Sequence, residues 1–482
     1  MQAPFVTRLR SAALSSALLA SSWILASPGT VHAQGAPPAP PPGYLFDMSS
    51  AGKAWGQMLK SYGIYVNGGF EENIYSVPSG GRKTGTFFQG EYTLGLDLDM
   101  NRILGIPGAA IHISTDDRTG PNPSRYYGSG ISSTANYGPN DAYRLAELSW
   151  DQDLFNDHVR ILVGRIADNI DFDTSELYCQ FLFSTCGNTN SWYFNHLNSS
   201  YPGVEWGGRI TLKPTLSTYF RTGAYEENSL GSGGVAPNYG WPWDPNFSFV
   251  ENKATQGVFV PAEMGYKTNF DNDAYPRGFD VGGYWDTSAF NDPLYNSSGL
   301  PLPLGSHILH DGKSLALKDR TGVYVQAQQM VYRVDNTSQR GLTVFGEALF
   351  DTSGGGPVQH QVVGGLWDKG PLPFRPADSL GFSVNWWQFN QRFEQALMES
   401  YGLQGPANTP NHNEYELELN YGFELAPGVE LKPVVAYWIH PDMAFGLSFP
   451  GKTHANNAWL VGAQLSLSPN GAFGLPAFVR TN

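Results

Sequence analysis

The segment Asn413–Leu425, NEYELELNYGFEL, alternates apolar and polar side chains along its whole length. The apolar positions carry Tyr415, Leu417, Leu419, Tyr421 and Phe423. The polar positions carry Glu414, Glu416, Glu418, Asn420 and Glu424. A period of two is the pattern of a β-strand with one apolar and one polar face. The segment therefore predicts a strand that separates an apolar environment from water.

The same alternation recurs along the chain from Gly63 onward. Sixteen segments are predicted as strands, near residues 64–74, 86–98, 109–115, 143–153, 158–165, 203–213, 215–226, 257–268, 278–286, 321–333, 341–350, 358–367, 378–388, 413–425, 428–440 and 457–468. The chain is therefore expected to be an all-β protein.

The connections between these segments alternate in length. The long ones cover residues 116–142, 166–202, 227–256, 287–320, 389–412 and 441–456, and the short ones cover 155–157, 213–214, 334–340 and 426–427. Outer-membrane barrels have short periplasmic turns, long external loops and an even strand number. We therefore predict a transmembrane antiparallel β-barrel of about 16 strands. A soluble β-sandwich or propeller is the alternative, but neither fold requires connections that alternate in length.

The composition agrees with a barrel. Of the 482 residues, 41% are hydrophobic and only 15% are charged, yet the mean hydropathy is −0.30. No segment after the N-terminal one approaches the roughly 20 apolar residues of a spanning helix, which excludes a helical membrane protein. An aromatic content of 14% argues against disorder. In a barrel, half of each strand faces a wet lumen, which lowers the mean hydropathy.

The N-terminus has the pattern of a secretory signal peptide. Arg8 and Arg10 precede the apolar segment 11–26, and Val31-His32-Ala33 offers a small-residue cleavage site. A short membrane anchor is the alternative, but the short length and the small-residue exit favour cleavage. We expect residues 1–33 to be a signal peptide. The predicted segments that follow are a Pro-rich linker at 34–46, an amphipathic helix at 47–62 and the barrel at 63–482.

A series of short motifs resembles the carbohydrate-selective porins of the OprB type. In order they are Trp55-Gly56 with Leu59-Lys60-x-Tyr62-Gly63-Ile64, Tyr92 to Asp99, Leu104 to Ala109, Tyr143 to Gln152, Val163-Gly164-Arg165-x-x-Asp168, Tyr201 to Val204, Glu414 to Tyr421, and Leu431-Lys432-Pro433 to His440-Pro441. They extend from about Trp55 to Ser468. The resemblance implies a periplasmic N-terminal helix, a barrel in the bacterial outer membrane and a constriction loop that folds into its lumen.

The C-terminal region departs from the usual pattern of such barrels. Their last strand typically ends on an aromatic residue, whereas this chain continues from Pro469 to Asn482. Phe478 would supply the terminal aromatic residue only if residues 472–479 contribute to the closing strand.

The sequence carries none of the motifs that would indicate an enzyme. It has no G-x-S-x-G, no H-E-x-x-H and no P-loop, and its ten histidines lack the spacing of metal ligands. Glycosidases use two carboxylates, but alternate strand residues share a face, so the Glu414–Glu418 series is expected in any acidic lumen. Asp171 and Asp173 are a second pair of carboxylates. We therefore expect no catalysis, no cofactor and no metal.

The long connection 166–202 is the strongest candidate for the constriction. It combines acidic residues with aromatic ones, which favours folding inward over a disordered external loop. Its Cys179 and Cys186 are the only cysteines of the chain. Because an exported protein meets oxidising conditions, we expect a local disulfide between them, with free thiols as the alternative.

A sugar channel needs aromatic faces for pyranose rings and polar groups for hydroxyls. The strand alternation and the entry to the 166–202 loop predict lumen residues of both kinds. The candidates for pore lining and constriction are Arg165, Asp168, Asp171, Asp173, Glu205, Arg209, Tyr219, Arg221, Glu347 and Trp387. For each of them, general lining of the lumen is the alternative to a solute contact.

The leading functional hypothesis is passive, carbohydrate-preferring diffusion of mono- and small oligosaccharides across the outer membrane. A general or cation-preferring porin is the first alternative, because the net charge is −14. A secreted polysaccharide-binding or polysaccharide-hydrolysing β-protein is the second. The expected partners are carbohydrate solutes and outer-membrane lipid, with no nucleic acid, and the chain is expected to act as a monomer or a homotrimer.

Overall fold

The computed structural model describes residues 43–132, 134, 142–187, 189–195, 201–228, 255–299, 314–400, 411–441 and 455–479. The chain divides into two units, Met1–Ala39 and Pro40–Asn482, and everything below concerns the second. The predicted signal peptide and most of the predicted linker lie outside the described residues.

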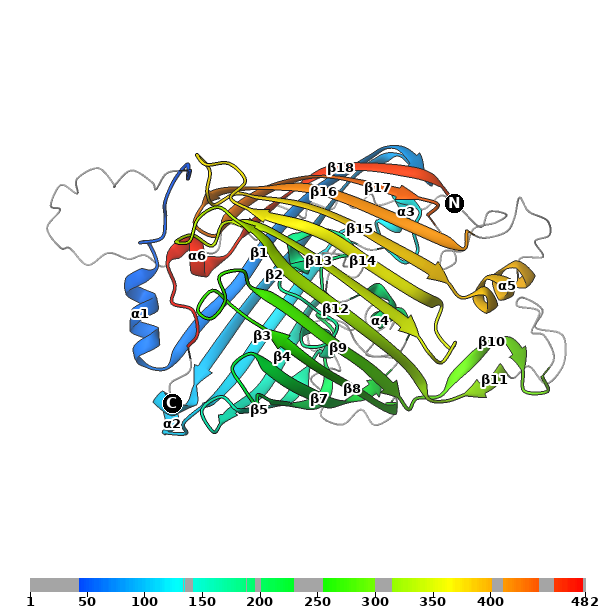
Figure 1. Cartoon of the computed structure of the whole chain (residues 1–482), viewed down its shortest axis with the longest axis horizontal. Helices are drawn as coiled ribbons and strands as arrows, with labels where there is room; N and C mark the ends of the chain where they lie inside the picture. The colour runs from blue at the N-terminus through cyan, green and yellow to red at the C-terminus, as the bar shows by residue number, and fades with distance from the viewer. Residues whose placement is uncertain are drawn as a thin grey trace, which may run out of the picture. The chain divides into compact units, whose positions relative to one another are not determined.

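Sixteen of the described strands close into one antiparallel barrel (Figure 1). They are β1 (Ile64–Gly81), β2 (Gly85–Asp99), β3 (Ala109–Thr119), β4 (Ala142–Leu154), β5 (Val159–Ile166), β6 (Glu205–Leu212), β7 (Thr218–Asn228), β8 (Thr255–Lys267), β9 (Arg277–Asp286), β12 (Arg320–Arg333), β13 (Gly341–Asp351), β14 (Val358–Lys369), β15 (Ser379–Phe389), β16 (Asn413–Ala426), β17 (Val429–Ile439) and β18 (Asn456–Leu467). Each pairs with its neighbours in sequence order, and β1 pairs with β18 to close the ring. The predicted barrel of about 16 strands is confirmed, and each predicted strand corresponds to an observed one.

The two faces of each strand differ as the alternation predicts. In β16, Glu414, Glu416 and Glu418 are at most 1% exposed, whereas Leu419 on the outer face is 49% exposed. In β12, the outward Val323 and Val325 are exposed. Apolar side chains thus cover the outside, and the polar ones point inward. Among the described residues, no helix is long and apolar enough to cross a membrane.

The structure extends one predicted strand and adds a small sheet that was not predicted. β1 continues past residue 74 to Gly81, because register shifts after Ser76 and Ser79 let the strand accommodate Pro78. In addition, β10 (Phe290–Asn296) and β11 (Ser314–Leu317) form a small separate sheet in the connection between β9 and β12. This pair lies in a segment that the prediction treats as a plain long loop.

The helices are short. They are α1 (Lys53–Ser61), α2 (Met100–Leu104), α3 (Ser124–Tyr127), α4 (Asn190–Asn195), α5 (Gln391–Ser400) and α6 (Pro469–Phe473), with the 3-10 turns η1 (Asp168–Ile170) and η2 (Tyr178–Gln180). The helix predicted at 47–62 begins only at Lys53. The Asp47 carboxylate accepts a hydrogen bond from the Ser49 backbone N–H, which forms a local turn in place of the first helical turn.

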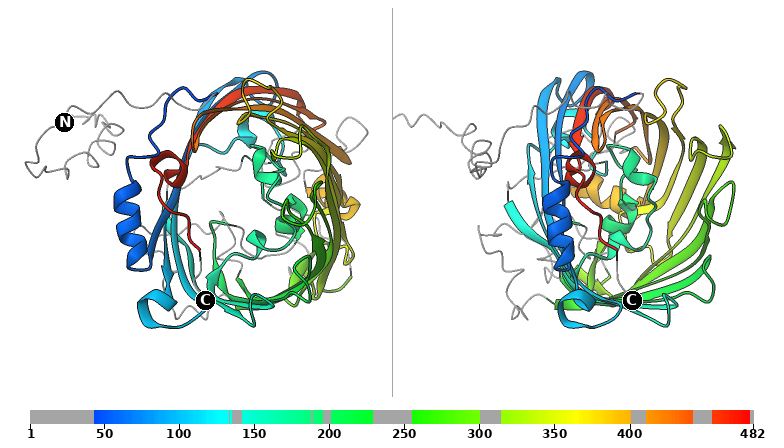
Figure 2. Two further views of the ribbon diagram at one scale, coloured as in Figure 1. Left: turned by 60° about the vertical axis from the view of Figure 1, so that its left-hand side comes forward. Right: turned by 90° about the vertical axis from the view of Figure 1, so that its left-hand side faces the viewer.

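Residues 472–479 do not join the closing strand, because β18 ends at Leu467 and α6 follows it. The segment after α6 turns back to the barrel. There the Phe478 ring packs edge-on against Tyr65, with 5.2 Å between ring centroids, and against His112 at 5.4 Å. Both views in Figure 2 show this segment beside α1 at the end of the barrel that carries the short turns.

The described residues of the connection between β5 and β6, which are 167–187, 189–195 and 201–204, lie inside the barrel and are called the inner loop below (Figure 2). Its aromatic side chains pack against inward-facing rings of the wall. One buried cluster joins Phe172 and Trp192 of the loop to Tyr225, Phe259, Tyr284 and Tyr324 of the strands. The hydrophobic core of the protein therefore lies between the inner loop and the barrel wall.

Candidate functional site

The inner loop is fastened to β16 by the carboxylates of that strand. The Glu418 carboxylate accepts hydrogen bonds from the backbone N–H groups of Leu182 and Phe183, at 3.0 and 3.1 Å. The Glu416 carboxylate accepts one from the Ser184 hydroxyl at 2.7 Å, and also one from Ser132 of the β3–β4 connection. Hydrogen bonds to charged acceptors are stronger than neutral ones, so these glutamates act as anchors for the loop.

A second set of polar contacts fixes the loop along β12 and β14. Both the backbone N–H and the hydroxyl of Ser191 donate to Gln361 Oε1 at 2.8 Å. The Tyr178 hydroxyl donates to Gln326 Oε1 at 3.0 Å, and the side-chain amide of Asn195 donates to the Val358 carbonyl at 2.8 Å. The described part of the loop is therefore held at several points around the wall.

Trp192 gives the loop its main apolar anchor. Its ring meets Phe259, Tyr284 and Tyr324 in edge-to-face contacts, with centroid distances of 5.2 to 5.6 Å. Its indole Nε1–H donates to the Asp168 carboxylate at 2.7 Å. Buried tryptophan normally finds such a partner, since an unpaired N–H in the core is costly.

Cys179 and Cys186 form a disulfide within the inner loop, in agreement with the pairing expected for an exported chain. Both cysteines line the central cavity, and the described residues contain no free cysteine. The bond closes the short segment between η2 and α4, so it limits the shapes that this part of the loop can adopt.

Asp173 lies where the loop meets β12 and β13 and is fully buried. Its carboxyl accepts hydrogen bonds from the backbone N–H and the hydroxyl of Thr189, at 2.9 and 2.6 Å, and lies beside the carboxyl of Glu347. Burial raises the pKa of Asp173 to about 6, although the bonds from Thr189 act in the opposite direction. Burial also raises the pKa of Tyr178 well above its usual value.

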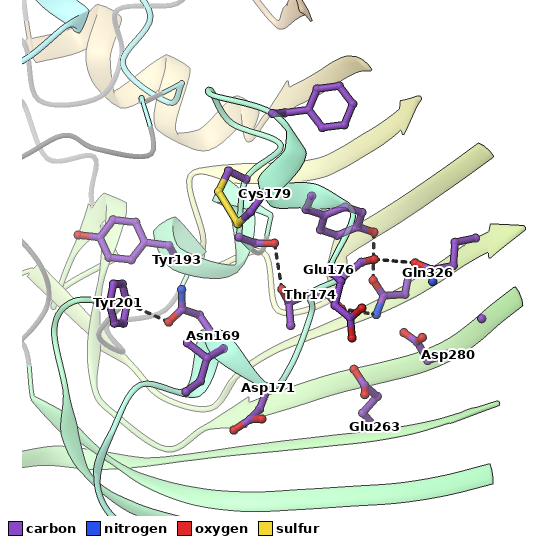
Figure 3. A pocket seen from close by; sticks show the side chains of 18 of the residues that line it. Asn169, Asp171, Thr174, Glu176, Cys179, Tyr193, Tyr201, Glu263, Asp280 and Gln326 are labelled. Carbon is purple, nitrogen blue, oxygen red and sulfur yellow. Dashed lines mark hydrogen bonds between the residues drawn. A yellow bond between two sulfur atoms is a disulfide. The ribbon is translucent and has the colours of Figure 1, made fainter. Parts of the chain in front are cut away.

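The space left beside the inner loop is a cavity of about 1650 Å³ (Figure 3). Its aromatic lining consists of Tyr178, Phe181, Tyr193, Phe194, Tyr201, Tyr219 and Phe270. Its acidic lining residues are Glu71, Glu91, Asp171, Glu176, Glu263 and Asp280, and its basic ones are Arg118, Arg144, Lys213, Arg221 and Lys267. The cavity therefore offers ring faces together with both signs of charge.

One wall of the cavity is built around Arg221 of β7. The guanidinium lies 5.2 Å from the centroid of the Tyr219 ring and 3.8 Å from the Glu263 carboxylate. The Tyr219 hydroxyl donates to Glu263 Oε1 at 2.7 Å, and Arg221 also donates to the backbone carbonyl of Asp171. Each side chain on this wall is thus positioned by another one.

A second part of the cavity wall is built around Arg118 of β3. Its guanidinium donates to Glu91 Oε1 at 2.8 and 3.0 Å and lies 5.6 Å from the Tyr201 ring centroid. The Tyr201 backbone N–H donates to Asn169 Oδ1 at 2.8 Å, which ties this residue to the base of the inner loop (Figure 3).

The structure separates the ten predicted lining residues into two groups. Asp171, Tyr219 and Arg221 line the cavity. The others are buried behind the inner loop, each at most 8% exposed: Arg165, Asp168, Asp173, Glu205, Arg209, Glu347 and Trp387. Asp168 and Asp173 belong to the loop, and the other five lie on strands. Their placement suits anchoring of the loop more than contact with a solute.

Several lining residues are missing from the sequence prediction. Arg118 lies beyond the strand predicted at 109–115, because the charged run Asp116-Asp117-Arg118 resembles a loop, whereas β3 continues to Thr119. Glu91 falls on the polar face of a predicted strand, so alternation could have found it. Tyr201 lies in a connection, where no periodicity applies. Among the described residues, no group of three or more His, Cys, Asp or Glu side chains could hold a metal ion.

Comparisons with known proteins agree with this architecture. The family described as "Carbohydrate-selective porin, OprB family" matches residues 85–468. The chain is 23% identical to Porin B of Pseudomonas aeruginosa over 88% of its own length and 87% of that protein. It is 25% identical to the putative porin QuiX of Acinetobacter baylyi, over 79% of its own length and 82% of that protein.

Among solved structures, the high-pH structure of Pseudomonas putida OprB superposes with a TM-score of 0.76 at 21% identity, covering 88% of this chain and 99% of that one. This likeness shows the shared fold. The family match extends over most of the chain, from β2 to the end of β18. The chain therefore belongs to the OprB family of carbohydrate-selective porins, and it is a carbohydrate channel of the bacterial outer membrane.

Proposed function

We propose that mono- and small oligosaccharides diffuse passively through the cavity beside the inner loop. In this proposal, solutes pass along the two parts of the cavity wall that carry Arg118 and Arg221. Tyr201 and Tyr219 present ring faces to the apolar faces of pyranoses, and the arginines and carboxylates exchange hydrogen bonds with sugar hydroxyls. Each contact is weak and replaceable, which suits a channel that must release its solute.

The observation that carries this proposal is the balance of charge along the cavity. Among the described residues, six acidic and five basic side chains line it, although the chain as a whole has a net charge of −14. Glu414, Glu416 and Glu418, which could have attracted cations, are buried and at most 1% exposed. A nearly balanced lining favours neutral polar solutes over ions of either sign, which argues against the cation-preferring alternative.

The contribution of the ring faces can be tested by replacing Tyr219 with alanine and with phenylalanine. We expect Tyr219→Ala to weaken sugar block of single-channel current about 3- to 10-fold, since an aromatic contact contributes roughly 1 kcal/mol. Tyr219→Phe keeps the ring but loses the hydroxyl bond to Glu263. Its sugar block should therefore be weaker than that of the wild type and stronger than that of Tyr219→Ala. Unchanged block in Tyr219→Ala would remove this residue from the solute path.

Selectivity itself is tested by swelling of proteoliposomes in neutral sugars and in charged solutes of matched size. We expect the neutral sugars to enter faster. Equal rates for all solutes would indicate a general pore, and faster entry of cations would support the cation-preferring alternative.

We also infer that the short turns, α1 and α6 face the periplasm and that the long connections face the cell exterior. The distribution of connection lengths supports this orientation, because external loops of such barrels are the long ones. Protease added to intact cells should then cut the long connections and leave epitope tags in the β16–β17 turn undigested. Cleavage of the tagged turn would reverse the orientation.

A further inference from the structure

α1 exposes an apolar face that none of the described residues covers. Trp55 and Met58 are each 50% exposed, and Tyr62, directly after the helix, is 67% exposed. These three positions lie on one side of the helix, because residues three and seven apart share a face. Lys53, Gln57 and Lys60 occupy the other side.

The contacts that hold α1 in place are made by another side of the helix, which carries Gly52 and Gly56. An added Cβ at Gly56 would lie 2.6 Å from Pro476, and one at Gly52 would lie 2.8 Å from Leu475, so the C-terminal segment packs closely on these glycines. The Gly52 backbone N–H also donates to the Phe473 carbonyl at 2.8 Å. α1 therefore packs against the C-terminal segment through its two glycines, and the side that carries Trp55 is available for another contact.

The position of α1 brings this apolar face to the rim of the barrel. Both views in Figure 2 show the helix along the wall beside β1, not across the opening. Neighbouring short connections at this end also expose apolar side chains, including Ile103, Leu104 and Phe155. The outward Leu94 and Leu96 of β2 continue this surface onto the lipid-facing wall. The apolar face of α1 is therefore close to a surface that phospholipid already covers.

We propose that α1 lies in the membrane interface and binds the phospholipid of the inner leaflet of the outer membrane. Trp and Tyr prefer the headgroup level of a bilayer because their rings are amphipathic, which suits Trp55 and Tyr62. Lys53 and Lys60 on the opposite side are long enough to reach anionic phosphates. The assignment to the inner leaflet rests on the orientation proposed above, whereas the contact with lipid does not.

The test uses a bimane probe on an introduced cysteine in proteoliposomes of phosphatidylethanolamine and phosphatidylglycerol. The native cysteines are paired, so only the new thiol reacts. Trp55→Cys places the probe on the apolar face, and Gln57→Cys places the matched control nearly opposite. Neither position lines the cavity, so sugar flux through both variants should equal that of the wild type.

We expect lipids with a nitroxide near the headgroup to remove most of the fluorescence at position 55 and little at position 57, with the reverse for aqueous iodide. Both leaflets contain the same lipids, so the outcome does not depend on orientation or on sugar selectivity. Equal quenching of both positions by iodide would overturn the proposal. Protection of position 55 from both quenchers, increasing with protein density, would overturn it in favour of a second copy of the chain.

Discussion

Removal of the Glu418 carboxylate should release the inner loop from one side of the barrel. Glu418 is 1% exposed and accepts hydrogen bonds from two backbone N–H groups of the loop. Each bond to a buried charged group contributes about 1.5–3 kcal/mol, so Glu418→Ala should weaken docking of this segment by about 3–6 kcal/mol. That range corresponds to a shift of about 10²- to 10⁴-fold between docked and undocked loop.

Single-channel recording in planar bilayers measures this shift directly. Glu418→Ala should have a higher mean conductance and more open-channel noise, and sugar block should weaken because the cavity loses its shape. Glu418→Gln keeps an acceptor oxygen without the charge and should show a smaller change. The matched control is Glu424→Gln on the same strand, whose carboxylate accepts a bond from Gly428 in the turn. If Glu418→Ala conducts like the wild type and this control, Glu418 does not anchor the loop.

Three further predictions concern the inner loop. Reduction of the Cys179–Cys186 bond, or replacement of both cysteines by serine, should lower the stability of the inner loop by about 2.5 kcal/mol, which is the entropic cost of closing a loop of about eight residues. The measurement is the open-channel noise in single-channel recordings before and after addition of reductant. Unchanged noise would contradict a stiffening role of the disulfide. Trp192→Ala should destabilise the loop by about 3–5 kcal/mol, measured as a lower Tm. The control Trp285→Ala, on the exposed outer face, should lower the Tm less. An equal decrease of Tm in both variants would exclude Trp192 as the main anchor. Burial raises the pKa of Asp173 to about 6 in the folded loop, from roughly 4 in an unfolded chain. The folded form therefore binds the proton more tightly, so the free energy of unfolding should fall as the pH rises from 4 to 6 and level off above pH 6. Asp173→Asn should weaken this dependence of Tm on pH, since the adjacent Glu347 carboxyl remains, and an identical profile in the variant would refute the assignment to Asp173.

The barrel could be predicted from the sequence because its signal is local. Alternation in segments such as Asn413–Leu425 indicates which side chains face lipid and which face the lumen. This periodicity can be read from one strand without knowing which strands pair with it. The closing pair of β1 and β18 follows from the requirement that no edge stays unpaired in a membrane. The end of β3 was harder to predict, because the charged run Asp116-Asp117-Arg118 resembles a loop, whereas Arg118 lies in the strand and lines the cavity.

The lining of the cavity could be predicted only in part because it depends on distant contacts. Alternation places Glu205, Glu347 and Trp387 correctly on the inner face, but it cannot tell whether a folded loop covers them. Glu418 and the backbone of Leu182 are 236 residues apart in sequence, and no local pattern joins them. The lining residues that alternation did find, Tyr219 and Arg221, lie on β7, where their side chains reach the cavity.

The route of the inner loop has a consequence for how the barrel assembles. Many of its polar anchors lie on β12 to β16, whereas the loop itself follows β5, so these partners are synthesised long after the loop. Contacts of such large sequence separation form late, because the intervening chain must first be ordered. An incomplete barrel therefore contains the loop without the surface that receives it. The cavity beside the loop is therefore complete only when the second half of the wall is in place.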